Sequence, residues 1–255
     1  MSVAEEPGRR PRGPFALALL ILLGVVLFAG FIALGTWQVY RLQWKRDLIA
    51  RVDARVHAAP TPAPGPAQWP GITAQSDEYR HVRLQGVFLH DRQTLVWAAT
   101  DLGSGYWVMT PLQQADGTIV LVNRGFAPTD WCGTSGRCER GPEGDVTLTG
   151  LLRMSEPSNV IRHNDPSRDS WYTRDVAAIA DKRGLEHVAP YFVDEDAAPG
   201  SLEPGRHTRP QGGLTVIAFP NNHLSYLITW YALALMVLGA GIYVARDEMK
   251  LRHGR

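Results

Sequence analysis

The chain has 255 residues, 45% of them hydrophobic, and its 26 Lys and Arg against 25 Asp and Glu give a formal net charge of +1 at pH 7. This near-neutral balance, without a basic run, argues against nucleic acid as a partner. Two uncharged apolar runs near the two ends argue against a wholly soluble protein, because each is long enough to cross the hydrocarbon core of a bilayer as a helix.

The first apolar run predicts a transmembrane helix at residues 15–36, after a tail at residues 1–14. The alternative is a cleaved signal peptide, which the basic flank before the run would suit. A signal core is usually about 7 to 15 residues long, which is shorter than this run. No clear cleavage site follows before Trp37 and Tyr40, which are typical interfacial aromatics. We therefore favour a retained anchor.

The same helix is expected to continue beyond the membrane, over residues 37–57. A run with five prolines then predicts an extended, semi-rigid spacer, a Pro-rich linker at residues 58–71. The evidence for the helical continuation is the spacing of four residues that fall on one helix face, namely Trp37, Arg41, Trp44 and Leu48.

Residues 72–222 are predicted to form one extracytoplasmic domain of mainly antiparallel β structure with one helix. Asp116-Gly117, between two strand-like runs, is a hairpin signature. The helix is expected at residues 173–183, with Gly184 as its stop. The expected strands are residues 79–89, 94–99, 106–112, 118–123, 146–153, 191–193 and 214–219.

The second apolar run predicts a transmembrane helix at residues 223–245, which stops sharply at Arg246, and a tail at residues 246–255. The fold class is therefore an α+β membrane protein, in which a hairpin of two transmembrane helices flanks the β-rich domain.

The orientation depends on flanking charges and on two cysteines. Five positive charges follow the first span and three precede it, which alone would place the tails outside; four follow the second and two precede it, which favours tails inside. Long loops translocate largely regardless of charge. Cys132 and Cys138 stand in a glycine-rich loop where a small disulfide would persist only in an oxidising compartment. We expect a multi-pass protein of the cell (inner) membrane, with both termini cytoplasmic and the domain on the extracytoplasmic side.

Five segments resemble the surfeit-locus family of cytochrome c oxidase assembly proteins, over nearly the whole chain. Each segment is short, and the specificity comes from their order between two spans. They are residues 34–38 (Leu-Gly-Thr-Trp-Gln), 105–112 (Gly-Tyr-Trp-Val-Met-Thr-Pro-Leu), 120–126 (Val-Leu-Val-Asn-Arg-Gly-Phe), 171–172 (Trp-Tyr) and 220–226 (Pro-Asn-Asn-His-Leu-Ser-Tyr).

This resemblance implies a two-span protein that helps to build haem-copper oxidases, and in some bacterial members a haem a chaperone. The implied partners are the membrane, the catalytic subunit of cytochrome c oxidase and, as a candidate, haem A synthase. His223 is the implied axial ligand of the haem iron, and Trp230 lines the same site.

The residues themselves favour that site up to a point. Haem iron accepts a histidine imidazole, and Tyr226 and Trp230 follow His223 at a spacing that puts all three on one helix face. By its position, a cation such as Arg41 or Lys45 is expected to meet the haem propionates. The alternative is an interfacial or capping histidine beside ordinary membrane-belt aromatics.

Catalysis finds little support in the sequence, so we expect no enzyme. The eight histidines are scattered, and neither a nucleophile elbow nor a phosphate loop is present. Three functions remain, of which the first two are a haem chaperone for oxidase biogenesis and a membrane scaffold that stabilises assembly intermediates without haem. A membrane-anchored outer enzyme is a third, opposed by the missing catalytic constellation.

Overall fold

The computed structural model describes residues 11–132, 141–197, 210–215 and 221–253. The chain divides into two compact units, and we describe each by itself. The first unit joins the N-terminal part of the chain, up to Ala50, with the C-terminal part from Ala218. The second unit is Arg51–Ile217.

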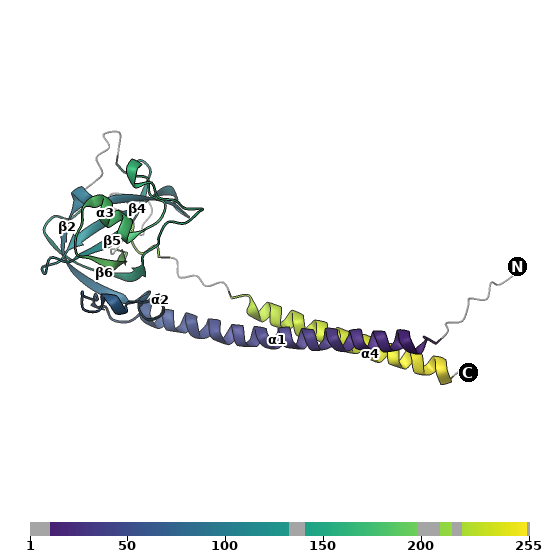
Figure 1. The fold of residues 1–255 in the computed structure, drawn as a ribbon. Helices are drawn as coiled ribbons and strands as arrows, with labels where there is room; N and C mark the ends of the chain where they lie inside the picture. Colours follow the sequence, from purple (N-terminus) through teal and green to yellow (C-terminus); the bar gives the residue numbers. More distant parts are fainter. Residues whose placement is uncertain (1–10, 133–140, 198–209, 216–220, 254–255) are drawn as a thin grey trace. The chain divides into compact units, whose positions relative to one another are not determined.

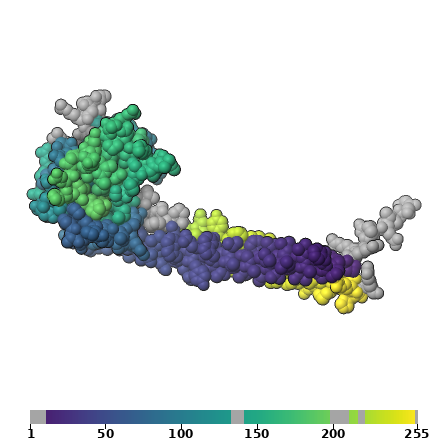
Figure 2. Space-filling view, in the orientation of Figure 1, coloured from purple at the N-terminus to yellow at the C-terminus, as the bar shows by residue number. Residues whose placement is uncertain are grey.

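Two long helices make the first unit: α4 (His223–His253) and the part of α1 (Pro14–Val56) that precedes Arg51. They lie alongside each other in an antiparallel pair (Figures 1 and 2). Each contains a stretch that is long and apolar enough to cross a membrane. Their large apolar side chains, such as Leu22 and Leu235, are exposed, as on a helix surface that lipid covers. The expected spans at 15–36 and 223–245 fall inside these helices.

The second unit is built on one seven-stranded sheet with the order β1-β2-β6-β7-β5-β4-β3. An additional antiparallel pairing joins β2 to β4, with Phe88 opposite Leu112, and closes five of the strands into a barrel-like ring. The pairs β1–β2 and β5–β7 are parallel, and the others are antiparallel. The strands are β1 (Thr61–Pro62), β2 (His81–Phe88), β3 (Thr94–Thr100), β4 (Gly103–Gln113), β5 (Ile119–Pro128), β6 (Asp145–Met154) and β7 (Val188–Glu195).

The core of this unit has two parts, one inside the ring and one outside it. Strand β5 serves both, because its successive side chains point to opposite faces. Val120 and Val122 belong to the inner cluster, whereas Ile119 and Leu121 belong to the outer one. A strand buried on both faces explains why residues 119–122 read as an uninterrupted apolar run.

Short helices complete the unit. Helix α3 covers the outer cluster with Ile179, and it begins after Asp175, whose carboxylate accepts from the backbone N–H of Ala178 at 3.2 Å. It ends at Gly184, which has φ 61°. The helices of this unit are α2 (Ala74–Asp77) and α3 (Val176–Arg183), with 3₁₀ turns at η1 (Trp69–Gly71), η2 (His90–Arg92) and η3 (Pro166–Arg168).

Six of the seven expected strands correspond to β2–β7, with ends that differ by a few residues. The seventh, at residues 214–219, is different. Leu214 and Thr215 belong to no strand, and residues 216–219 lie outside the described residues. It is Gln211 that pairs with Phe126 of β5, as an isolated bridge. The expected helix at 173–183 begins at Val176 because Asp175 caps it.

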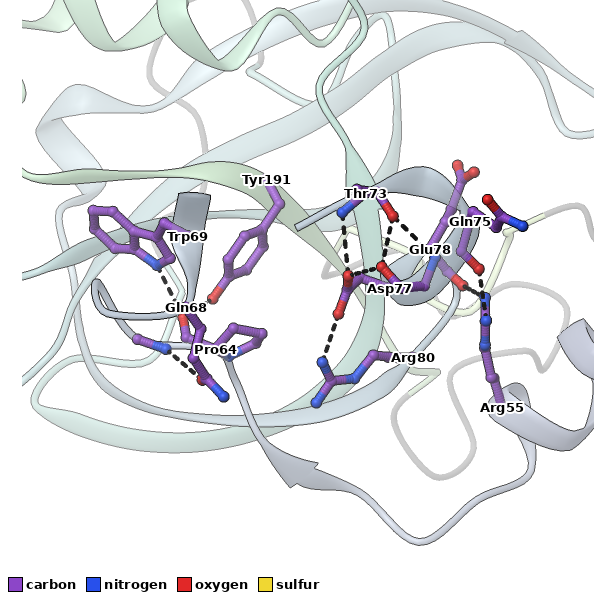
Figure 3. Close-up of polar contacts among 12 residues, drawn as sticks. Arg55, Pro64, Gln68, Trp69, Thr73, Gln75, Asp77, Glu78, Arg80 and Tyr191 are labelled. Carbon is purple, nitrogen blue, oxygen red and sulfur yellow. Dashed lines mark hydrogen bonds and ion pairs between the residues drawn. The ribbon is translucent and has the colours of Figure 1, made fainter. Parts of the chain in front are cut away.

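The proline-rich segment, which we expected to be an extended, semi-rigid spacer, is packed against the domain. Strand β1 pairs in parallel with β2, so the segment supplies an edge of the sheet. The carbonyl of Pro64 accepts hydrogen bonds from the Tyr191 hydroxyl at 2.7 Å and from Trp69 Nε1 at 2.9 Å (Figure 3). Proline composition predicts an extended backbone, and an edge strand tolerates proline because its outer side needs no donor. Composition does not reveal whether that backbone is packed.

The last turn of α1 is fastened to the same part of the domain. Arg55 donates to the carbonyls of Gln75 and Glu78, at 2.7 and 3.2 Å, and so satisfies backbone acceptors at the end of α2 (Figure 3). Asp77 accepts from the Thr73 N–H at 3.2 Å and from Arg80 at 2.6 Å. Residues 51–80 are therefore an integral part of the second unit.

Replacing Tyr191 with Phe tests this packing. We expect the free energy of unfolding to fall by about 1–2 kcal/mol, because a buried hydrogen bond is lost and the Pro64 carbonyl keeps only one donor. Denaturant unfolding of the full chain in mild detergent, followed by tryptophan fluorescence, measures the change. Tyr172→Phe is the matched control, since the Tyr172 side chain is exposed. Equal effects of the two substitutions would contradict a packed proline-rich segment.

Candidate functional site

The helix pair brings together two of the segments singled out in the sequence. Residues 34–38 lie in α1, and residues 221–226 lead into the first turn of α4. Because the helices are antiparallel, the start of α4 lies beside this part of α1. His223, the predicted haem ligand, stands at the first position of α4 and is half-buried.

A hydrogen bond between Gln38 and His223 connects the two segments. Oε1 of Gln38 lies 2.8 Å from Nδ1 of His223, and Gln38 is buried. A carboxamide oxygen only accepts, so Nδ1 carries the hydrogen and donates it. In a neutral imidazole, Nε2 then keeps its lone pair. Within the described part of the chain, Nε2 has no hydrogen-bond partner.

Aromatic side chains of α4 pack on α1 next to this hydrogen bond. The ring of Trp230 stacks on Phe31, with centroids 5.8 Å apart and an interplanar angle of 25°. The Tyr231 hydroxyl lies 3.3 Å from Thr36 Oγ1. The Tyr231 ring also lies over Gly35, where an added Cβ would come within 2.9 Å of it. Glycine at this position allows the close approach of the two helices.

Two other predicted site residues, Arg41 and Tyr226, form no hydrogen bond, ion pair or ring contact with His223 among the described residues. The guanidinium of Arg41 lies over the ring of Trp44, 4.7 Å from its centroid. Tyr226 is exposed. The predicted disulfide stays a prediction, because Cys138 lies outside the described residues.

Sequence reasoning placed Gln38 in a motif but gave it no role. The sequence feature that could have pointed to Gln38 is a neutral amide just after the apolar run of α1. A buried amide at such a position needs a partner. The partner is expected on the opposite helix, although the sequence alone does not say which residue of that helix forms the hydrogen bond.

A buried charge cluster is the other candidate site, in the second unit. The carboxylate of Asp194 receives hydrogen bonds from Asn123 at 2.8 Å, Thr215 at 2.9 Å, Arg153 at 3.0 Å and Arg174 at 3.1 Å. These groups line a cavity of about 190 Å³. Sequence reasoning missed Asp194, since its partners come from distant parts of the chain.

The side chain of Arg174 contacts both aromatic rings and carboxylates. Its guanidinium lies 4.7 Å from the ring centroid of Phe192 and 5.8 Å from that of Trp107, and it binds both carboxylate oxygens of Glu156. Burial alone would lower the pKa of Arg174, but the charges of Asp194 and Glu156 outweigh it and raise that pKa. The ion pairs and hydrogen bonds among these charges indicate a structural network.

Two further observations bear on chemistry in the domain. Gly125, in the resembling segment 120–126, has φ 115°, and a Cβ there would meet the Gln211 carbonyl oxygen at 2.0 Å. The turn therefore requires glycine for backbone reasons. Among the described residues, no group of three or more His, Cys, Asp or Glu side chains is arranged to hold a metal ion.

Comparison with known proteins places these features in a family context. The model of the SURF1 family matches residues 25–235. The chain is 36% identical to Surfeit locus protein 1 of Rattus norvegicus over 217 residues, which cover 78% of this chain and 67% of the rat protein. It is 34% identical to Surfeit locus protein 1 of Homo sapiens over 234 residues, covering 85% and 73% of the two chains. It is also 34% identical to the SURF1-like protein of Monosiga brevicollis over 241 residues, covering 89% and 86%.

The Glu156–Arg174 ion pair predicts a pH dependence of stability. Burial alone would raise the pKa of Glu156, but the hydrogen bonds and charge of Arg174 outweigh it, so that pKa lies below its ordinary value of 4.5. A lowered folded-state pKa stabilises the fold above the unfolded-state pKa, and this stabilisation is lost as the pH falls through the folded-state pKa. We therefore expect the thermal midpoint to decline as the pH falls below 4.5.

The measurement is thermal unfolding by near-UV circular dichroism over a pH series. The matched variant is Glu156→Gln, which should show a lower midpoint at neutral pH and a shallower acid decline. The same decline in the variant and the unmodified chain would assign the acid sensitivity to other carboxylates.

Proposed function

Because the chain belongs to the SURF1 family, we propose that it assists the assembly of cytochrome c oxidase in the membrane. The observation that carries this proposal is the extent of the family match. Residues 25–235 begin within α1, contain the whole second unit and end within α4. The likeness thus extends into both candidate spans and covers the whole domain between them, as expected if the function is shared by the whole architecture.

We further propose that haem a is the cargo and that His223 binds its iron. Haem iron accepts one imidazole nitrogen as an axial ligand, and the Gln38 hydrogen bond leaves Nε2 of His223 for that role. The residues present therefore fit a haem that is held by a single protein ligand. Trp230 and Tyr226 would flank the macrocycle, and Arg41 would meet its propionates.

Gln38 acts in this proposal through His223. A partner that accepts the hydrogen of Nδ1 fixes the tautomer and the ring orientation of a ligating histidine, and it increases the basicity of the other nitrogen. His223 is only half-buried. Partial exposure suits a site that must release its cargo, because a fully enclosed ligand would need a large opening motion.

The proposed setting follows from the same function. The chain would span the cell (inner) membrane twice, with both termini cytoplasmic and the domain on the extracytoplasmic side. Its proposed partners are the catalytic subunit of the oxidase, which receives haem a, and haem A synthase, which supplies it.

A scaffold without haem is the second candidate function. The observation that favours it is the same Gln38–His223 contact, read as an interhelical hydrogen bond that stabilises the helix pair. The saturated cluster around Asp194 also has a purely structural explanation. In this case His223 is needed only for its contribution to packing.

Complementation tests the assembly role. In cells that lack this protein, we expect less assembled cytochrome c oxidase, measured as oxidase activity and a-type haem absorbance of membranes. The unmodified chain should restore both signals. Unchanged oxidase in its absence would contradict an assembly role, whatever the chain binds.

His223→Ala and His253→Ala are the informative variants of that experiment. His253 is an exposed histidine at the other end of α4, so its substitution controls for the loss of an imidazole. A haem-delivery role predicts that only His223→Ala fails to restore oxidase while accumulating to the normal level. Full restoration by His223→Ala would favour the scaffold.

Haem binding has its own test, in the optical spectrum of the full chain purified in mild detergent from cells that make haem A. We expect an a-type haem signal in the unmodified chain and in His253→Ala, and none in His223→Ala. Gln38→Leu keeps the ligand but loses its hydrogen-bond acceptor, so haem affinity should fall about 10- to 100-fold. A haem signal that survives His223→Ala would place the ligand elsewhere.

A further inference from the structure

The loop between β6 and α3 carries two apolar side chains at its tip. Val160 is 102% exposed and Ile161 is 93% exposed. The other exposed large apolar side chains described in the second unit reach at most 50%. Burying one such side chain is worth about 1.5–3 kcal/mol. The fold of this chain does not obtain that free energy from Val160 and Ile161, because both stay exposed.

A hydrogen-bonded turn fixes the shape of the tip. The side-chain oxygen of Asn159 accepts from the backbone N–H groups of Ile161 at 2.9 Å and Arg162 at 2.8 Å. The backbone N–H of Asn159 donates to the Arg162 carbonyl at 2.9 Å. These bonds satisfy polar groups that would otherwise make it costly to bury the tip in an apolar medium.

The base of the loop is anchored to the domain. Asn164 is buried, and its side chain donates to Thr173 Oγ1 at 2.8 Å. Its side-chain oxygen accepts from the backbone N–H groups of Tyr172 at 2.8 Å and Thr173 at 2.9 Å. Its own N–H donates to Ser158 Oγ at 3.0 Å. The domain therefore holds the two apolar side chains out on an ordered support.

Positive charge stands next to the tip. Arg162 and His163 follow Ile161 and are exposed, and Arg162 takes part in none of the ion pairs between described residues. Three of the four acidic residues of the same loop are in ion pairs, and the fourth, Asp175, caps α3. The three ion pairs are Glu156–Arg174, Asp165–Arg168 and Asp169–Arg183.

The size of the tip decides which kind of partner fits it. A stable protein interface covers about 800 Å² on each partner, far more than two aliphatic side chains provide. Insertion into the boundary between lipid headgroups and acyl chains needs a depth of only about 5–10 Å. A cation beside the inserted residues is attracted to anionic headgroups, by about 1 kcal/mol each.

We infer that Val160 and Ile161 form a membrane-insertion tip, which enters the bilayer that α1 and α4 span, with Arg162 among the headgroups. A few kcal/mol would hold a free protein only weakly. The chain is already joined to the membrane on both sides of the domain, so insertion would be an intramolecular step that needs far less binding energy than the recruitment of a free protein. This inference rests on the two spans, and it does not depend on haem or on the oxidase.

The experiment places a fluorescent amino acid at Ile161 of the full chain, reconstituted in vesicles of zwitterionic and anionic lipid. The lipid carries a nitroxide quencher near the headgroup end of its acyl chain. The matched control has the same fluorophore at Arg168, which lies in the same loop with an almost fully exposed side chain. We expect lipid quenching at position 161 to exceed that at 168 by about threefold or more, and iodide in water to quench in the opposite order.

A second variant tests the charge. Arg162→Gln should remove the increase in quenching at position 161 that follows a rise in the anionic lipid fraction. Equal and weak lipid quenching at positions 161 and 168, with full iodide access to both, would overturn the inference. The apolar tip would then be left to a protein partner.

Discussion

One buried carboxylate, that of Asp194, holds together segments that are far apart in the chain. It stands in β7 and accepts from Asn123 of β5, Arg153 of β6, Arg174 and Thr215. Burying charges costs several kcal/mol for each ion, and only close pairing with additional hydrogen bonds compensates that cost. The cluster is therefore favourable only when every partner is in place. It makes the arrangement of these segments cooperative, and loss of either arginine would leave carboxylate charge in the domain without its counter-ion.

The helix pair follows a different physical rule. Between helices in lipid, the apolar side chains provide little net driving force, so small residues and polar contacts determine how they associate. Gly35 under the Tyr231 ring and the Gln38–His223 hydrogen bond are contacts of this kind. In the proposed haem role, the same contact that orders the pair would leave Nε2 of the imidazole for a ligand. A structural role and the proposed chemical role of His223 would thus use one geometry.

The parts of the fold that depend on local pattern were predictable. Apolar length indicated α1 and α4, and strand-like runs with turn signals between them indicated β2 to β7. Long-range relations were not. Proline content could not reveal that β1 joins β2, and the run ending at Val193 gave no sign that Asp194 would be buried with two arginines. For the site, residues 34–38 and 220–226 were recognised from resemblance, but only the structure pairs Gln38 with His223. The apolar tip was missed because Val160 and Ile161 form an apolar run of only two residues.

The place of β7 in the sheet has a consequence for biosynthesis. Strands β5 and β6 do not pair with each other; β7 lies between them and pairs with both. Until residues 188–195 have been made, the ring stays open, with the facing edges of β5 and β6 unpaired. Open strand edges are prone to pair with other chains. A nascent domain thus passes through a vulnerable stage that ends only shortly before α4 is synthesised, and a chain that stops ahead of β7 would lose the central strand of its sheet together with the carboxylate of Asp194.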